Sequence, residues 1–191
     1  MTLNLRKGEK VELTKGNPNL KKIKIELGWQ TNKYDGGRDF DLDASVFLLN
    51  DKDKCIRDDD IVFYNNMKHL SGSVIHSGDD RTGGGTKDNE IITIDLPKIP
   101  QNIDKISAVI TIYDANIRRQ NFGLVNDAFA RVLDDTGKEI LRYNLGEDFS
   151  IETAVVVCEI YKYQNEWKFA AVGSGFAGGL EQICKNYGLN V

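Results

Sequence analysis

The sequence is poor in cysteine, histidine and proline, and it has no long hydrophobic run. Its three cysteines, Cys55, Cys158 and Cys184, lie far apart and form no CxxC pair, so we expect reduced thiols that pack rather than react. The only histidines are His69 and His76, and neither has a cysteine ligand nearby. A zinc site is therefore not expected.

Targeting and membrane signals are also missing. Residues 1–16 contain no apolar signal core, and no stretch approaches the length that spans a bilayer. The net charge of -4 and the lack of a Lys/Arg-rich run argue against nucleic-acid binding. We therefore expect a cytoplasmic protein with no nucleic-acid partner and no direct membrane insertion.

Short apolar runs separated by turn residues favour strands over long helices, since the chain holds 18 glycines and only three prolines. In the segment 22–29, Ile23, Ile25, Leu27 and Trp29 alternate with polar residues, which is typical of a half-buried strand. Similar runs recur along the chain, and 128–145 and 153–172 look like hairpins. Residues 118–127 are compatible with a loop or with one helical turn. We predict one domain, 1–191, folded as a mainly β, antiparallel β-sandwich of about ten strands.

One helix is expected near the C-terminus. Leu180, Ile183, Cys184 and Tyr187 follow the i, i+3, i+4, i+7 spacing of an apolar helix face. Gly188 is placed to end that helix as its cap. This short helix should seal one edge or end of the sandwich.

The stretch 72–90 concentrates carboxylates around a run of glycines. Asp79, Asp80, Asp88 and Glu90 flank the segment 83–86, GGGT, with few apolar residues between them. Such a segment cannot be buried unpaired, because buried charge is costly. It is either a solvated acidic loop or an oxygen cage for a hard cation such as Ca²⁺.

A second acidic pair opens the run 44–49. Asp41 and Asp43 are two residues apart, so in an extended chain their side chains point to the same face. They alternate with Phe40, Leu42 and Ala44, which suit a buried face. Acids in such surroundings are better explained when a positive group meets them.

Two familiar motifs fail on closer reading. The segment 79–90 has the length of an EF-hand loop, but Arg81 and Gly83 occupy positions that need oxygen side chains, and its flanks read as strands. The segment 83–87, GGGTK, reverses the Lys–Thr order of a phosphate-binding P-loop. The neighbouring carboxylates would also repel phosphate.

Longer motifs resemble a known family. They are GWQTN, FDLDASVFLL, FYNN, GSVIHSGDDRTGGG, RRQNFGLVNDAFARV, EDFSIETAVVVCEIYKYQNEWKF and AVGSGFAGGL. Together they run over essentially the whole chain, which is similar to the TerD family of tellurite-resistance and general stress proteins. The resemblance implies a calcium-binding β-sandwich from bacterial stress-response clusters, with no established enzymatic activity. It also implies a cytoplasmic protein, loosely membrane-associated through partners.

The resemblance also implies the metal site. The family's acidic motifs correspond here to Asp41, Asp43, Asn65, Asp79, Asp80, Asp88 and Glu90, and Thr82 and the carbonyl of Gly83 are further oxygen donors. The usual family loop reads GDNxTGxGxGDDE, and this chain reads GDDRTGGGTKDNE. Asp80 therefore replaces an Asn, Lys87 a Gly and Asn89 an Asp.

The expected function is binding, with Ca²⁺ holding the glycine loop over the acidic strand start. If all six carboxylates converge, two ions compensate their repulsion better than one, so two Ca²⁺ are expected. Partners would be other proteins of a stress or tellurite-resistance cluster, one of them a membrane partner. A metal-dependent hydrolase that uses the same acids with His76 as general base is the alternative.

Overall fold

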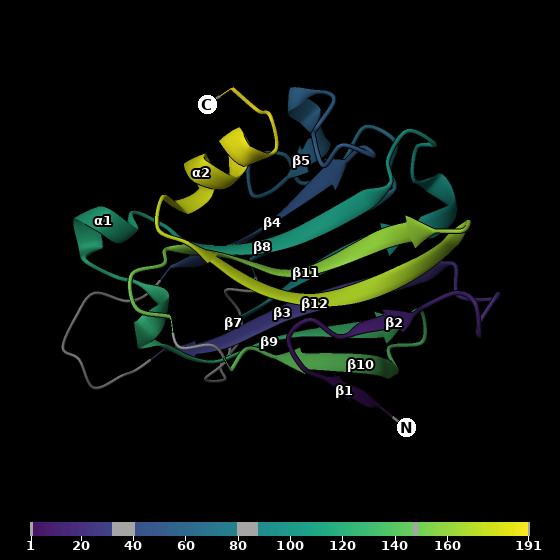
Figure 1. The fold of residues 1–191 in the computed structure, drawn as a ribbon, viewed down its shortest axis with the longest axis horizontal. Coiled ribbons are helices and arrows are strands. Elements are labelled where there is room, and N and C mark those ends of the chain that lie inside the picture. Colours follow the sequence, from purple (N-terminus) through teal and green to yellow (C-terminus); the bar gives the residue numbers. More distant parts are fainter. Residues whose placement is uncertain (1, 32–40, 80–87, 147–148, 191) are drawn as a thin grey trace.

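The chain folds as two β-sheets stacked face to face, in a computed structural model that describes residues 2–31, 41–79, 88–146 and 149–190 (Figure 1). Sheet A has six strands in the spatial order β1 (Leu3–Leu5), β10 (Glu139–Asn144), β9 (Val125–Asp134), β3 (Lys22–Thr31), β7 (Asp88–Asp95) and β6 (Val74–Asp79). Sheet B has six in the order β2 (Lys10–Glu12), β12 (Glu166–Phe176), β11 (Ala154–Tyr163), β8 (Lys105–Ile112), β4 (Leu42–Leu49) and β5 (Ile61–Val62). The predicted β-sandwich is confirmed, with more strands than expected.

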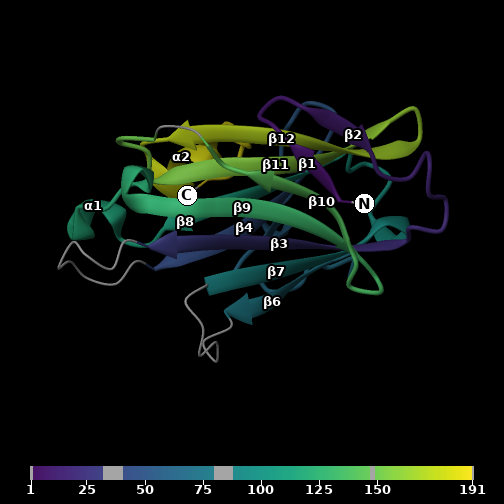
Figure 2. The same cartoon turned by 90° about the horizontal axis from the view of Figure 1, so that it is seen from below.

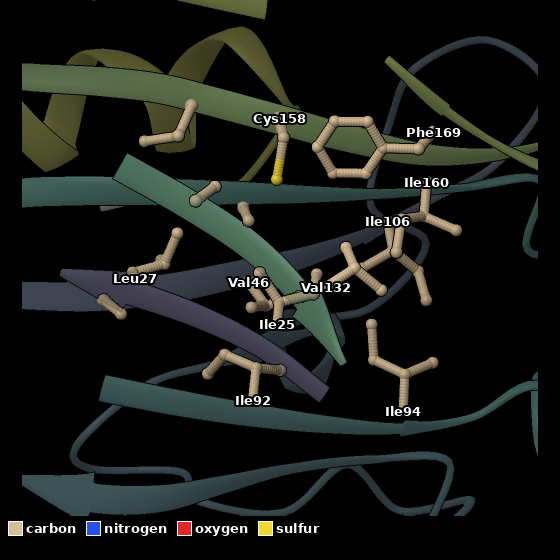
Figure 3. Packing of buried hydrophobic residues seen from close by; sticks show 14 of the residues in the cluster. Ile25, Leu27, Val46, Ile92, Ile94, Ile106, Val132, Cys158, Ile160 and Phe169 are labelled. Carbon is tan, nitrogen blue, oxygen red and sulfur yellow. The ribbon is translucent and has the colours of Figure 1, made fainter. Parts of the chain in front are cut away.

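The main core lies between the sheets and follows the predicted alternation. Ile23, Ile25, Leu27 and Trp29 of β3 all point inward and are buried. Figure 3 shows Ile25 and Leu27 packed with side chains of β7, β9 and β4 in this cluster. Residues two apart on a strand share a face, so the alternating pattern was enough to identify this inner face.

The outer face of sheet A carries charged side chains. Figure 2 shows β9, β3, β7 and β6 of this sheet side by side, and neither described α-helix lies across them. Glu26 belongs to this face, as its place in the alternation predicts, yet it is 5% exposed. Arg131 covers it, because one guanidinium nitrogen lies 2.8 Å from both carboxylate oxygens. A second acid, Glu139, accepts from the same guanidinium at 3.2 Å.

Sheet B is covered on its outer face by α2 (Gly179–Asn186) (Figure 1). Ile183 and Cys184 are buried there in a second apolar cluster with Phe47 and Val109. The helix was expected to seal an edge or end of the sandwich, but it packs on a sheet face instead. The C-cap residue is Tyr187 rather than the predicted Gly188, which follows it at φ 85°, a left-handed conformation that favours glycine just after a helix.

The N-terminal segment joins both sheets. β1 pairs in parallel with β10, and this pair departs from the otherwise antiparallel arrangement. β2 pairs antiparallel with β12 in the opposite sheet. The segment predicted as a loop or helical turn contains both: α1 (Ala115–Arg118) ends in it, a 3-10 turn follows at Phe122–Leu124, and β9 begins at Val125. Further 3-10 turns occupy Asp58–Asp60 and Leu96–Lys98.

Candidate functional site

Several strands end or begin together at the end of the sandwich near α1 (Figure 1). The strand register brings Trp29 of β3 opposite Asp88 of β7, and Asp79 of β6 opposite Glu90 of β7. In sheet B, Leu42 at the start of β4 lies opposite Ile112 at the end of β8. The backbones of the predicted acidic positions 79, 88 and 90 therefore lie on adjacent strands at this end.

Glu90 lies inside the sandwich rather than on its surface. It shares the inward face of β7 with Ile92 and Ile94 and is only 4% exposed. Its Oε2 accepts a hydrogen bond from the backbone N–H of Ala44 on β4 at 2.5 Å and lies 3.2 Å from Nε2 of His76 on β6. One carboxylate thus connects β6 and β7 of sheet A with β4 of sheet B.

The side chain of Asp43 points to the face of β4 opposite the one that the Glu90 carboxylate contacts. Ala44 points into the core between the sheets, so the neighbouring residues Asp43 and Ser45 point to the face that carries α2. There Asp43 lines a cleft that also includes Thr111 of β8. The described side chains of Asp43 and Glu90 are therefore separated by the strand itself.

Asp41 precedes β4 and is largely exposed. Its carboxylate forms an ion pair of 3.7 Å with Arg118 of α1, and its carbonyl accepts from the N–H of Tyr113 at 2.8 Å. The Arg118 guanidinium also lies over the Tyr113 ring, 5.4 Å from its centroid. The sequence suggested that a positive group lies beside Asp41. That group is the guanidinium of Arg118, which belongs to the chain itself.

The remaining predicted ligands are only partly visible. Asn65 is exposed in the turn that Phe63 and Asn66 close by reciprocal backbone hydrogen bonds. For Asp79 and Asp88 only the strand backbone is described, and Asp80, Thr82 and Gly83 lie outside the described residues. Within the described part of the chain, no three Asp, Glu, His or Cys side chains lie close enough together to hold a metal ion.

The described part of the predicted site offers one carboxylate oxygen to a further partner. Glu90 Oε1 has no hydrogen bond among the described residues, so one oxygen of this buried carboxylate is left for a further partner. The other predicted donors, including Asp79 and Asp88 on the neighbouring strands, are oxygen ligands too. Ca²⁺ takes about six to eight such oxygens in flexible geometry.

Comparison with known proteins decides the family. A sequence model described as the TerD domain matches residues 1–187. The chain is 55% identical to general stress protein 16U of Bacillus subtilis (strain 168), with full coverage of both chains. It is 49% identical to tellurium resistance protein TerD of Serratia marcescens over 100% of this chain and 99% of that one. The chain belongs to the TerD family.

A solved structure supports the TerD-family fold. The crystal structure of a homologue of telluride resistance protein (TerD) from Streptomyces coelicolor A3(2) matches with a TM-score of 0.69. The match covers 90% of this chain and 100% of that chain at 19% identity, so it bears on the fold alone. None of the described helices of this TerD-family chain is long and apolar enough to cross a membrane.

Both histidines of this TerD-family chain are buried against carboxylates, and sequence reasoning missed these pairs. His69 Nε2 lies 3.2 Å from Oδ1 of Asp60, and the ring's Nδ1 lies 2.7 Å from Ser71 Oγ. His76 pairs with Glu90 as described above. Their strand and turn positions indicated structural histidines, but the acidic partners are distant in sequence and became identifiable only through the fold.

The cysteines are packing residues, as predicted for this TerD-family chain. Cys158 and Cys184 are buried, Cys55 is half-buried, and all three are free thiols. Burial, together with the nearby Asp60 carboxylate, raises the pKa of Cys55 to about 12. Burial also raises the pKa of the Cys158 and Cys184 thiols. Because thiolates are the reactive form, these groups are poor nucleophiles.

Proposed function

We propose that this chain is a calcium-binding stress-response protein of the tellurite-resistance type. Its metal site lies at the end of the sandwich where β3, β4, β6 and β7 meet, and bound Ca²⁺ holds that end together. The names of its relatives, general stress protein and tellurium resistance protein, support the stress-response role. The calcium site is proposed from the residues of this chain and not from the names of its relatives.

The observation that carries the proposal is the buried carboxylate of Glu90. A carboxylate that is 4% exposed is expensive to bury unless several partners stabilise its charge. Its Oε2 already holds the Ala44 N–H, and Oε1 has no hydrogen bond among the described residues. The backbone of Asp79 lies opposite Glu90 on β6, and this second acid is proposed to share a cation with Glu90.

Ca²⁺ would supply positive charge that lets several carboxylates approach one another while ionised. Glu90 connects the site to β4, so a change in the charge around it acts on both sheets. The segment 80–87, rich in glycine, would supply Asp80, Thr82 and the Gly83 carbonyl. Asp41 pairs with Arg118 and Asp43 lies on the other face of β4, so four predicted carboxylates remain for this end, and two ions compensate their four charges better than one.

The protein is proposed to act as an interaction module whose surface is shaped by the bound ions. Its partners would be other proteins of a stress or tellurite-resistance cluster, in the cytoplasm or at the membrane through such a partner. The rival hydrolase needs His76 as general base. That ring is 3% exposed and already lies against Glu90, so it is poorly placed to reach a substrate.

Thermal unfolding with different metals tests the proposal. A ligand that binds only the native state stabilises it by mass action, so Ca²⁺ should raise the melting temperature. Mg²⁺ at the same concentration should do much less, because it demands a tighter octahedral shell and sheds water reluctantly. Equal shifts from both ions would contradict the proposed selectivity. Metal-dependent phosphatase or nuclease turnover with Mg²⁺ or Mn²⁺ would favour the hydrolase instead.

A further inference from the structure

A separate cleft on the outer side of sheet B is lined by residues of α1 and of the start of α2. Figure 1 shows where these two helices lie in the fold. Its volume is about 470 Å³, which is the size of a small-molecule site. The ends of β4 and β8 form its floor, and the residues just before and within the two helices form its walls. It opens on the face opposite the sandwich interior that holds Glu90.

The floor of the cleft carries one nearly buried hydroxyl. Ser45 lines the cleft and is only 1% exposed, yet its hydroxyl has no hydrogen bond among the described residues. It sits on the α2 side of β4, beside the register position of Val109 on β8. Its hydroxyl oxygen is not among the fully enclosed atoms that lack a partner, so it reaches the cleft that the residue lines. It is therefore available to accept a hydrogen bond from a ligand there or to donate one to it.

The charge of the lining selects the class of ligand. All the charged side chains that line the cleft in the described part of the chain are acidic: Asp43, Asp114 and Glu181. Glu181 is paired with Lys185, whereas Asp114 has no ion pair among the described residues. An anionic ligand would be repelled and would leave Asp114 uncompensated, so the cleft favours a cation.

The shape and the apolar walls favour an organic cation over a bare metal ion. These acids do not form a group that could hold a metal among the described residues, and the cleft is far larger than an ion. Ile117 and Leu180 add apolar surface on the two helical walls. The exposed ring of Tyr64 offers an aromatic face, which attracts organic cations.

We infer that this cleft binds a small organic diamine or polyamine. One ammonium group pairs with Asp114 and donates a hydrogen bond to Ser45 Oγ. The methylene chain lies along Ile117 and Leu180, and the second ammonium group faces Glu181 on the opposite wall. Each feature of the lining then has a partner on the ligand.

Amide NMR titration with putrescine tests this inference. The control ligands are 1,4-butanediol, which has the same chain length without charge, and succinate, which has the opposite charge. Working in EDTA removes Ca²⁺, so the outcome does not depend on the proposed metal site. Putrescine should bind saturably, with shifts concentrated at positions 43–45, 111–117 and 178–181. No saturable binding, or equal binding of butanediol, overturns the inference and leaves the calcium proposal standing.

Two variants with the same charge change test whether Asp114 binds the ammonium group of putrescine. Asp114→Asn should weaken putrescine binding about tenfold or more, because a charge-assisted hydrogen bond is lost. Asp135→Asn makes the same charge change in the exposed turn between β9 and β10 and should leave the affinity unchanged. Equal losses in the two variants would show general charge attraction and overturn the inference.

A second variant examines the buried hydroxyl. Ser45→Ala should weaken putrescine binding several-fold, and the protein should be no less stable, because the hydroxyl has no partner to lose. Unchanged affinity in folded Ser45→Ala would contradict the role given to Ser45.

Discussion

Glu90 and Ala44 connect the two sheets at the proposed metal end. The carboxylate of Glu90 reaches from β7 through the sandwich interior and accepts the backbone N–H of Ala44 on β4 at 2.5 Å. Among the described residues, no strand pairs with Ala44 on this side, because β5 pairs only with Val46 and Phe47. A side chain thus replaces a missing backbone partner at the open edge of β4.

This relationship predicts a difference between two substitutions. Glu90→Ala leaves the Ala44 N–H unpaired and should lower the free energy of unfolding by about 1–3 kcal/mol, the cost of an unsatisfied buried donor. Glu90→Gln keeps an acceptor oxygen and should cost less, while still removing the charge that a cation needs. Urea unfolding in EDTA gives both values. Equal losses would show that the Ala44 hydrogen bond is not what Glu90 contributes.

The helix α2 should matter for stability and not for calcium. Ile183 is 1% exposed against sheet B, so Ile183→Ala should cost about 2–5 kcal/mol. Leu180 is only partly buried, so Leu180→Ala should cost less than Ile183→Ala. Chemical unfolding and calcium calorimetry on the same samples check this. A large loss of Ca²⁺ affinity in a stable Ile183→Ala protein would place the metal site near α2.

The Asp60 carboxylate should make the free energy of unfolding fall as the pH becomes acidic. Burial alone would raise its pKa, but hydrogen bonds from His69 and from the N–H groups of Ile56 and Arg57 outweigh it and lower the pKa below the ordinary value of an aspartate. Because the folded pKa is depressed, the stabilisation is complete above the unfolded pKa and is lost as pH falls through the folded value.

Unfolding free energies measured from pH 6 downwards test this in Asp60→Asn. The variant should be less stable near pH 6, and its stability should fall less steeply at acid pH than that of the unchanged protein. Parallel curves for the two proteins would contradict the assignment. Asp135→Asn is the surface control.

The cysteines should be nearly inert in the native protein. Burial raises the pKa of Cys55 to about 12, so very little thiolate is present at pH 8. Alkylation by iodoacetamide should therefore be slow in the folded state and fast in urea, as followed by mass spectrometry. Rapid native labelling of Cys55 would show that the thiol is more accessible and more acidic than its surroundings indicate.

The sequence predicted the features that depend on local pattern. The alternation around Ile25 identified a half-buried strand, and the spacing of Ile183 and Cys184 identified the helix and its buried face. Glu26 shows the limit, since its polar position was correct but its burial depends on Arg131, which arrives from a distant strand. The same limit applies to His76, whose partner Glu90 is defined by strand register.

The candidate site was predictable only in part for a similar reason. The acids were visible as motifs, but the face on which each side chain leaves its strand is set by the sandwich. Asp43 and Glu90 are separated by β4, because the Asp43 side chain lies on the α2 face and the Glu90 side chain lies on the core face. The cleft that contains Ser45 and Asp114 arises where α1 and α2 approach the same sheet end, which no local pattern records.

Calorimetric titration with Ca²⁺ tests the central claim most directly. The unchanged protein should bind Ca²⁺ saturably with a stoichiometry of two, and Asp79→Asn should lose affinity, whereas the surface control Asp135→Asn should not. Folding of each variant is checked by circular dichroism before the titration. A folded, unchanged protein that shows no saturable Ca²⁺ binding would contradict the account.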